Sequence, residues 1–576
     1  MRPFLITSAQ AGKLPRWGLL LLIALYVLPG LFGRDPWATQ DAAGFGIAHT
    51  MATGSVSDWL MPNVAGAPVA EEGPLPFALG AVAIRVASVI VPGPQHVAHI
   101  ATGMVGASGL VLLLSLFWYA TYELAWRPSF QPHDPLGAAA SRTDLARAIA
   151  DSSLLVLIAT VGMVTRAHET TAEAAQLVWS CAFLFGVARS LERPRRGALC
   201  AAAAVAATAT TSGLVPAALL MSAWLALPLI SQPFRLVARP LLTLGLPVAI
   251  AGALVWPALL WFGDEHSRAF LQTWLAWNTQ QYGWPKAQAL GYLLRTGPWY
   301  FWPAWPLAAW AGWRWRGRLG EPALALPLMV AAVFLIAASL LQSPGETGLL
   351  PALPAIAMVA AAGLPTLRRR LVNLIDWFAV IVWTFFGFAV WAYWLAYLSG
   401  LPPRMAFRAS HIVPGYALEV SWLELGLAVA ATLAWLALVR WRISRRPPMI
   451  WRAVVLSAGG LVLSWFLAMT LWLPVFNERN TYRGIAGQLA HAVPLGSQCV
   501  AADGLGLAER ASLAYFADVR FAATGGGNSC DWRLIQDQGP VARAVPYPEP
   551  GWNLAWEGRR RPNLDERFRL YQRSGK

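Results

Sequence analysis

Residues 19–50 read LLLLIALYVLPGLFGRDPWATQDAAGFGIAHT, an apolar run that passes directly into a segment with two acids and a histidine. Such a run can enter a bilayer, and the acids after it would then lie just outside the lipid. The rest of the chain has the same character, since 57% of its 576 residues are hydrophobic and 13% are charged. Soluble proteins carry about 25% charged residues, so lipid is the main solvent of this protein.

The apolar runs predict a polytopic α-helical membrane protein with about thirteen transmembrane helices. The expected spans are 17–33, 98–122, 150–166, 172–190, 198–213, 214–231, 240–262, 298–313, 322–342, 350–364, 376–398, 418–439 and 453–473. Arg clusters occupy every second connection, which predicts a cytoplasmic N-terminus and a periplasmic C-terminus. Segment 75–97 is expected to be interfacial or continuous with the second span.

The formal net charge of +15 does not indicate nucleic acid, because the basic residues form short clusters between apolar runs and no patch. Lys13 and Arg16 precede the first apolar core, and no small-residue cleavage site follows it. This start predicts an uncleaved signal anchor and therefore a multi-pass protein of a bacterial inner membrane.

The composition changes after Pro474. Residues 1–474 are expected to form the transmembrane domain, and 475–576 a small periplasmic α/β domain. In the second part, QCVAAD and CDWRLIQD are expected to be strands, and LAERASLAYFAD the helix between them.

Two of the four cysteines, Cys499 and Cys530, fall in the C-terminal part, on the oxidising side of the membrane. A disulfide between them is plausible. Cys181 and Cys200 lie within apolar segments and are expected to be packing residues.

Polar residues gather in three connections on the predicted periplasmic side, namely 34–76, 166–173 and 263–303. Their ionisable residues include Asp35, Asp41, Glu71, Glu72, His168, Glu169, Glu173, Asp264, Glu265, His266, Arg268 and Lys286. Carboxylates, histidines and cations beside Trp and Tyr at a membrane surface suit an amphipathic substrate. Its lipid tail would lie in the bilayer, its phosphate would meet Arg or Lys, and its polar head would meet carboxylates.

This order of features resembles the bacterial GT-C glycosyltransferases related to the aminoarabinose transferase of lipid A and to the protein O-mannosyltransferases. In that family the first loop holds an acid, an amphipathic helix ending near Met-x-x-Gly-x-Trp, and a Glu-Lys-Pro-Pro-Leu segment. The matching residues are Asp41, Met51, Gly54, Trp59, Pro62, Gly66, Glu72, Pro74 and Leu75. DEHSRAF and LLPALPAIAMVAAAG also resemble family segments. Gly73 stands where the family has a phosphate-binding Lys.

The resemblance implies an enzyme that moves a sugar from a polyprenyl-phosphate donor to a lipid A, glycan or protein acceptor at the periplasmic face. One displacement at the anomeric carbon would invert its configuration. Asp41 is the candidate base or acceptor-orienting group, supported by Glu169 and Asp35. The candidates for substrate binding are Arg268, Lys286 and His168, with the two cations for the phosphate. Glu72 and His266 are the candidate ligands of a divalent metal ion.

Each of these residues also has a simpler explanation. Asp41 could cap the helix that follows it, and Asp35 could form a turn before Pro36. Glu72 and His266 could be solvated surface residues. The helix after Asp41, with Phe45, Ile47, Ala48 and Met51 as its apolar side, is expected to lie on the bilayer.

Two other functions stay open on the sequence. A transporter or flippase of lipid-linked sugars is also polytopic, although such proteins usually contain paired repeats and broken helices, and no repeat is evident here. A catalytically degenerate relative that binds glycolipid is the other, because the family Lys is absent at Gly73.

Overall fold

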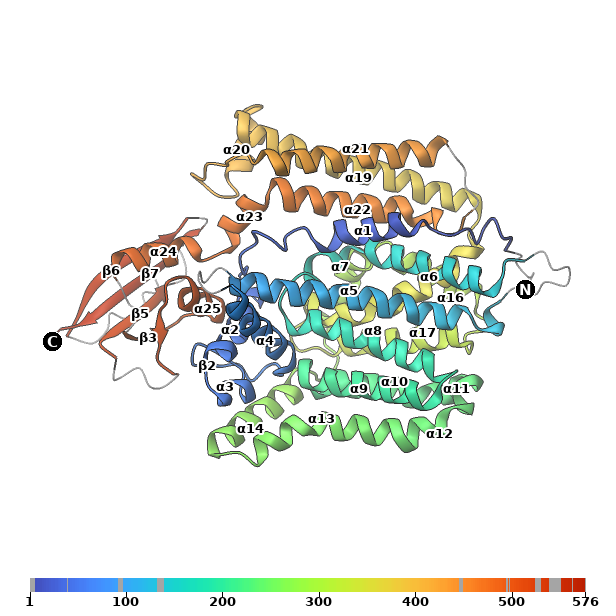
Figure 1. The fold of residues 1–576 in the computed structure, drawn as a ribbon, viewed down its shortest axis with the longest axis horizontal. Coiled ribbons are helices and arrows are strands. Elements are labelled where there is room, and N and C mark those ends of the chain that lie inside the picture. The colour runs from blue at the N-terminus through green and yellow to red at the C-terminus, as the bar shows by residue number, and fades with distance from the viewer. Residues whose placement is uncertain are drawn as a thin grey trace.

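The computed structural model shows a bundle of long helices with a small sheet domain at one end (Figure 1). The same end of the bundle carries the helices α2, α3 and α4. The structure describes residues 6–38, 40–91, 97–131, 139–444, 449–493, 496, 498–523, 530–537, 551–561 and 563–574.

Each of the thirteen predicted spans overlaps a helix of the bundle. These helices are α1 (Arg16–Val27), α5 (Val97–Ala125), α6 (Arg142–Ala159), α8 (Ala172–Ser190), α9 (Pro194–Ser212), α10 (Leu214–Ile230), α13 (Leu246–Trp261), α16 (Ala304–Arg314), α17 (Pro322–Ser339), α18 (Leu353–Gly363), α19 (Arg369–Ser399), α21 (Trp422–Ser444) and α22 (Arg452–Leu471). Within the described part of the chain, 7 helical segments are long and apolar enough to cross a membrane. The other predicted spans fall on helices that are shorter or less apolar. The polytopic fold class is therefore confirmed, while the number of crossings stays a prediction.

Small residues let the central helices approach one another closely. At Gly186 on α8 and Gly197 on α9, a Cβ atom would collide with the backbone of the opposite helix. Without a hydrophobic driving force in lipid, such close backbone packing is a main source of helix association. The two helices consequently form a tight antiparallel pair in the middle of the bundle.

The basic connections lie away from the sheet domain where Figure 1 labels them. Helices α11 (Gln232–Leu236) and α12 (Ala238–Pro240), which carry Arg235 and Arg239, are at the end of the bundle opposite the sheet. This placement agrees with the alternation of Arg clusters along the sequence.

The first loop folds into α2 (Gln40–Thr53), α3 (Val56–Leu60), a hairpin of β1 (Asn63–Val64) and β2 (Ala67–Pro68), and then α4 (Leu75–Ile90). Segment 75–97 was expected to be interfacial or continuous with the second span. Its described part forms α4, a separate helix that packs against α2 and α5.

The predicted helix after Asp41 is present as α2, but the surroundings of its apolar side differ from the expectation. Phe45, Ile47, Ala48 and Met51 are buried inside the protein, in a cluster with residues of α4 and of the C-terminal helix α25 (Leu507–Phe516). The prediction that this side lies on the bilayer is therefore wrong, because the sheet domain covers it.

The remaining helices connect the spans or follow the last of them. They are α7 (Val161–Arg166), α14 (Glu265–Gln280), α15 (Ala287–Tyr300), α20 (Pro403–Ser410), α23 (Leu473–Asn480) and α24 (Arg483–Ala492). Helix α14 lies at the same end of the bundle as the sheet domain, and α23 leads from the last span into that domain (Figure 1).

The C-terminal domain contains one mixed five-stranded sheet in the order β4-β3-β5-β7-β6. The strands are β3 (Cys499–Asp503), β4 (Arg520–Phe521), β5 (Trp532–Asp537), β6 (Trp552–Arg560) and β7 (Asn563–Arg573). Strand β3 pairs in parallel with β4 and β5, while β7 pairs antiparallel with β5 and β6. The two predicted strands and the helix between them are confirmed, and Cys499 and Cys530 form the disulfide.

Candidate active site

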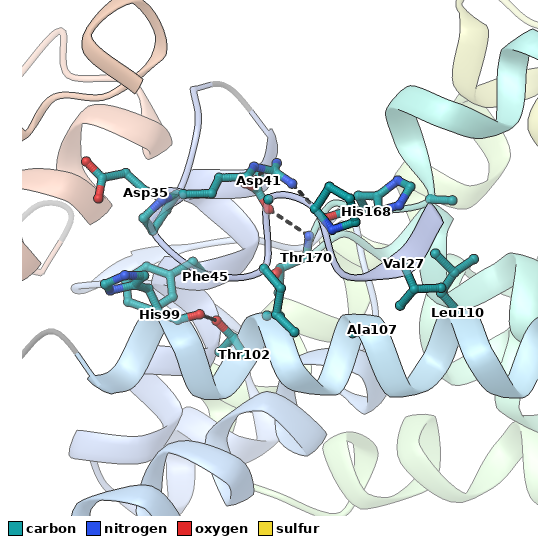
Figure 2. Close-up of a pocket in the computed structure, with 17 residues that line it drawn as sticks. Val27, Asp35, Asp41, Phe45, His99, Thr102, Ala107, Leu110, His168 and Thr170 are labelled. Carbon is teal, nitrogen blue, oxygen red and sulfur yellow. Dashed lines mark hydrogen bonds and ion pairs between the residues drawn. The ribbon is translucent and has the colours of Figure 1, made fainter. Parts of the chain in front are cut away.

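Asp41 lies in the first turn of α2, and the residue is only 8% exposed. Its Oδ2 atom accepts hydrogen bonds from Arg34 Nη2 at 2.8 Å and from the Trp37 backbone N–H at 3.1 Å. Its Oδ1 atom accepts from the Thr170 backbone N–H at 2.7 Å, as Figure 2 shows. These three donors lie outside α2, so the carboxylate joins the first loop to the 166–171 turn.

Glu169 lies in the same turn, beside Asp41. Burial, followed by the nearby charge of Asp41, raises the pKa of Glu169 to about 7, although Arg166 opposes this shift. Arg166 donates to Glu169 Oε2 at 3.1 Å and to Gln40 Oε1 at 3.3 Å. A carboxyl group whose pKa lies near neutral pH can accept or release a proton during turnover.

His168 holds this turn against α1 and does not point into open space. Its Nε2 lies 2.8 Å from the carbonyl oxygen of Tyr26, and its Nδ1 lies 2.9 Å from that of Val164. The ring also packs on Trp465, with 4.6 Å between ring centroids. Burial lowers the pKa of His168 to about 4, so the ring is neutral at pH 7 and donates to one of the two carbonyls.

A small cavity of about 50 Å³ lies beside Asp41 (Figure 2). At one end it is lined by Arg34, Asp35, Asp41 and His99, and at the other by apolar residues such as Leu110. The sequence analysis missed Arg34 and His99. Arg34 is adjacent to the predicted Asp35, and His99 lies at the start of the second span. Both could have been found by searching for ionisable residues at the ends of the spans.

A larger chamber of about 470 Å³ lies on the other side of the α8 N-terminus. Its lining is acidic and rich in amides, hydroxyls and aromatic rings, and the described residues that line it include no Lys, Arg or His. These polar and aromatic residues are Gln40, Glu71, Glu72, Glu173, Gln176, Ser212, Trp277, Gln280, Gln281, Tyr282, Gln342, Ser343 and Thr347. Burial, with Glu173 and Glu71 nearby, raises the pKa of Glu72 well above its ordinary value.

An apolar groove of about 560 Å³ runs between α4, α5 and α8. Side chains such as Phe77, Val86 and Val178 line its length, and it reaches Glu169 and Thr170. The groove and the chamber therefore meet different faces of the 166–176 segment, with Glu169 in the lining of the groove, Gln40 in that of the chamber and Asp41 in that of the small cavity.

The other predicted binding residues lie elsewhere. Arg268, Lys286 and His266 are exposed on α14 or on the turn after it, and none lines the groove, the chamber or the small cavity. Arg268 Nε donates to the carbonyl of Asp264 in its own helix, at 3.3 Å. Their proposed contacts with substrate stay predictions.

The predicted metal ligands Glu72 and His266 do not form a site on their own. Glu72 lies in the chamber with Glu71 and Glu173, whereas His266 is at the exposed start of α14. Among the residues that the structure describes, no group of three or more His, Cys, Asp or Glu side chains could hold a metal ion. The structure thus does not place His266 in the chamber with Glu72; the metal ion stays a prediction, and no step below uses a metal.

Gly73, which stands in place of the family Lys, is fixed by its neighbours. Its N–H donates to the carbonyl of Thr211 at 2.9 Å, and a Cβ atom at this position would collide with the backbone of Thr210. The loop therefore rests directly on the end of α9, where a side chain has no room.

No protein-family model matches the chain, and no curated protein matches it. The solved structures that are similar to it include two crystal structures of ArnT from Cupriavidus metallidurans. The structure bound to undecaprenyl phosphate has a TM-score of 0.67 and 15% sequence identity, over 96% of this chain and 97% of that chain. The apo structure has a TM-score of 0.68 and 15% identity, over 96% of this chain and 98% of that chain. The chain therefore shares the ArnT fold over nearly its whole length.

Proposed function

We propose that this chain is an integral-membrane glycosyltransferase that moves a sugar from a polyprenyl-phosphate donor to a lipid A, glycan or protein acceptor. The transfer takes place at the periplasmic face of a bacterial inner membrane. The observation that carries the proposal is that the 166–176 segment separates an apolar groove, which Glu169 lines, from a polar chamber, which Glu173 lines, while Asp41 is bonded to Thr170 of the same segment. An amphipathic donor needs both of these environments side by side.

The polyprenyl tail occupies the apolar groove in this proposal. The groove is lined by α4, α5 and α8 and ends at Glu169 and Thr170. One of the similar solved structures, that of ArnT from Cupriavidus metallidurans, contains undecaprenyl phosphate, which supports a lipid of this class here. Burial of the tail supplies binding free energy in proportion to the apolar area covered.

The sugar occupies the polar chamber. Amides and carboxylates suit sugar hydroxyl groups, and Trp277 and Tyr282 offer aromatic faces to a sugar ring. Because the lining contains Glu71, Glu72 and Glu173 and no basic side chain, it favours a neutral or positively charged sugar over an anionic one.

The donor phosphate lies near Arg166. This guanidinium bonds to Gln40, which lines the chamber, and to Glu169, which lines the groove. A donor with its tail in the groove and its sugar in the chamber would place the phosphate between them, near Arg166. Arginine is well suited to such a phosphate because it can donate two parallel hydrogen bonds. Arg268 and Lys286 remain proposed contacts for a larger substrate that covers α14.

The reaction is a single displacement with inversion. Asp41 orients an acceptor hydroxyl, whose oxygen forms a bond to the anomeric carbon while the bond from that carbon to the phosphate oxygen breaks. The hydroxyl proton passes to the Asp41–Glu169 carboxylate pair, and polyprenyl phosphate leaves with the bonding electrons. The phosphate is already a good leaving group, so the site orients the nucleophile and stabilises charge without protonating the donor.

Mass spectrometry of lipid A, envelope glycans and glycopeptides, from cells with and without the gene, tests this function. We expect one class of molecule to lose a sugar-sized mass when the gene is deleted and to regain it when the wild-type gene returns. If all three classes are unchanged in cells that express the protein, transferase function is contradicted.

The second candidate function is that of a relative that binds the lipid-linked donor without transferring the sugar. The absence of a basic side chain among the described residues that line the chamber favours it. Gly73 replaces the family Lys, and the chamber offers three carboxylates without a basic side chain. Such a protein would bind undecaprenyl phosphate, as native mass spectrometry can show, but would transfer no sugar in the cellular comparison.

A further inference from the structure

The turn that precedes Asp41 is held by a side chain from the far end of the sequence. Asn477, on α23, accepts hydrogen bonds at Oδ1 from the Asp35 N–H at 3.1 Å and from Trp37 Nε1 at 2.9 Å. Its Nδ2 donates to the carbonyl of Gly33 at 2.6 Å. One amide side chain thus satisfies three polar groups of the turn, and the neighbouring Asn480 carbonyl accepts from the Ala38 N–H at 2.8 Å.

A second link runs from α24 to the same turn. Asp35 is only 5% exposed, and its carboxylate forms an ion pair with Arg483 at 2.6 Å. Asp35 projects toward the C-terminal domain in Figure 2. The guanidinium of Arg483 also packs over the ring of Phe516 on α25, at 4.8 Å. A buried carboxylate is costly without a partner, so this pair fastens the turn to the sheet domain.

The turn that Asn477 and Arg483 hold in place contains two of the residues that donate hydrogen bonds to Asp41. Trp37, whose indole bonds to Asn477, donates its backbone N–H to the Asp41 carboxylate. Arg34 stacks on the Trp37 ring at 4.3 Å and donates to the same Asp41 oxygen. Two of the three donors to Asp41 therefore depend on a turn whose conformation is set from α23 and α24.

The sheet domain also covers the far side of α2. Tyr515 on α25 packs edge-on against Phe45, with 4.8 Å between ring centroids, and its hydroxyl lies 3.2 Å from Nδ1 of His99. A side chain at Gly46 would collide with Ala511 of α25. The contact is thus a continuous packed interface, which gives the turn a rigid support.

We propose that Asn477 and Arg483 are positioning residues, through which the C-terminal domain holds Asp41 in its reactive orientation. Asp35 belongs to the same support, since its carboxylate is engaged by Arg483. The inference rests on the proposed function only where it treats Asp41 as the reactive carboxylate. The contacts of Asn477 and Arg483 with the turn stand independently of it.

Hydrogen exchange of the purified full-length protein, followed by mass spectrometry, tests the proposal. The backbone N–H groups of Trp37 and Thr170 both donate to Asp41; the indole of Trp37 bonds to Asn477, whereas Thr170 reports on Asp41 from the other side of the carboxylate. In Asn477→Leu, which removes all three hydrogen bonds, we expect both amides to exchange about tenfold faster or more. Asn477→Asp keeps the Oδ1 acceptor and loses the bond to Gly33, and it serves as the milder variant if the Leu variant does not fold.

Matched variants separate positioning from general loss of stability. Arg483→Gln should also speed exchange at Trp37 and Thr170, and Arg483→Lys, which keeps the charge, should restore protection. Arg510→Gln is the control, because Arg510 on α25 bonds to the carbonyl of Ala65, away from the turn. This control should leave exchange at Trp37 and Thr170 unchanged.

Two results would overturn the proposal. Wild-type exchange at Trp37 and Thr170 in both Asn477 variants would show that the turn needs no support from α23. Equal acceleration in Arg510→Gln would show that the domain only stabilises the fold. Turnover then follows as a second readout, where a lower kcat with unchanged KM for the donor is expected. Absence of any transfer by the wild-type protein would reject the proposed function and leave the exchange result to decide the positioning.

Discussion

At the scale of single residues, Glu169 is the group whose ionisation changes near neutral pH, since the pKa is raised to about 7. A carboxyl group must be ionised before it can accept a proton. Turnover should therefore rise as the pH increases through about 7 and level off above about 8. In Glu169→Gln this rise should disappear, because the amide does not titrate.

A pH–rate profile measures this effect. Glu346→Gln is the matched control, since Glu346 lies 3.8 Å from Arg166 but is half exposed, and its profile should keep the rise. If wild-type turnover falls as the pH passes 7, the protonated carboxyl is the active form and Glu169 does not take up the proton.

Gly73 gives a second prediction at this scale. Restoring the family residue by Gly73→Lys should not create a phosphate site, because even a Cβ atom collides with the backbone of Thr210. The substitution should instead destabilise the protein by about 1–3 kcal/mol, a cost typical of overpacking. Gly106→Ala is the control, since a Cβ there meets open space, and its thermal unfolding should match wild type. A wild-type melting temperature for Gly73→Lys would contradict this account.

The sequence identified some residues of the site and missed others for definable reasons. Asp41 could be found because it matches the acid in the first loop of the family that the sequence resembles, and Glu169 because an acid flanked by spans is costly unless it has a use. Arg268 and Lys286 were chosen for their charge, and they lie exposed on α14 and just before α15, outside the lining of the cavities. Asn477 could not be found, because its partners lie more than 400 positions earlier in the chain.

At the scale of elements, helix α2 shows that an apolar helix face can be covered by another domain of the protein instead of by lipid. The spacing of Phe45, Ile47, Ala48 and Met51 predicts a one-sided helix, and the helix is present. The spacing does not say what covers that side. Lipid and the α25 surface are both apolar, so only the tertiary structure distinguishes them.

The Cys499–Cys530 disulfide gives the prediction at this scale. The bond closes a loop with a sequence separation of 31 and ties β3 to the residues before β5. Its removal by Cys499→Ser with Cys530→Ser should lower the stability of the sheet domain by about 3 kcal/mol, mainly through the entropy of the unfolded chain. Cys181→Ser is the control for a cysteine outside the domain. An unchanged denaturation midpoint of the sheet domain in the double variant would contradict the prediction.

At the scale of the whole molecule, the order of helices follows from the apolar runs, because a span is a local property of about 20 residues. The small mixed sheet was also foreseeable, since two of its strands and a helix follow simple patterns. The packing of this domain against the first loop could not be predicted, because it depends on contacts between residues near the two ends of the chain.

The topology can be tested in intact cells with single engineered cysteines and an impermeant thiol reagent, in a background without Cys181 and Cys200. A cysteine at Arg195, in the first turn of α9, should stay unlabelled. A cysteine at Lys286 should be labelled, since it lies exposed at the start of α15. Labelling at Arg195 would overturn the predicted orientation.

The central claim is that the Asp41 carboxylate takes part in sugar transfer. The most direct measurement is the turnover of purified Asp41→Asn with a polyprenyl-phosphate sugar donor. Asn keeps the shape of the side chain and removes its charge, so turnover should fall by roughly 10²- to 10⁴-fold. Asp58→Asn, in the same loop and bonded only to Ser55 and Asn63 in its own turn, should change turnover little. Near-normal transfer by Asp41→Asn, with its thermal unfolding unchanged, would contradict the account.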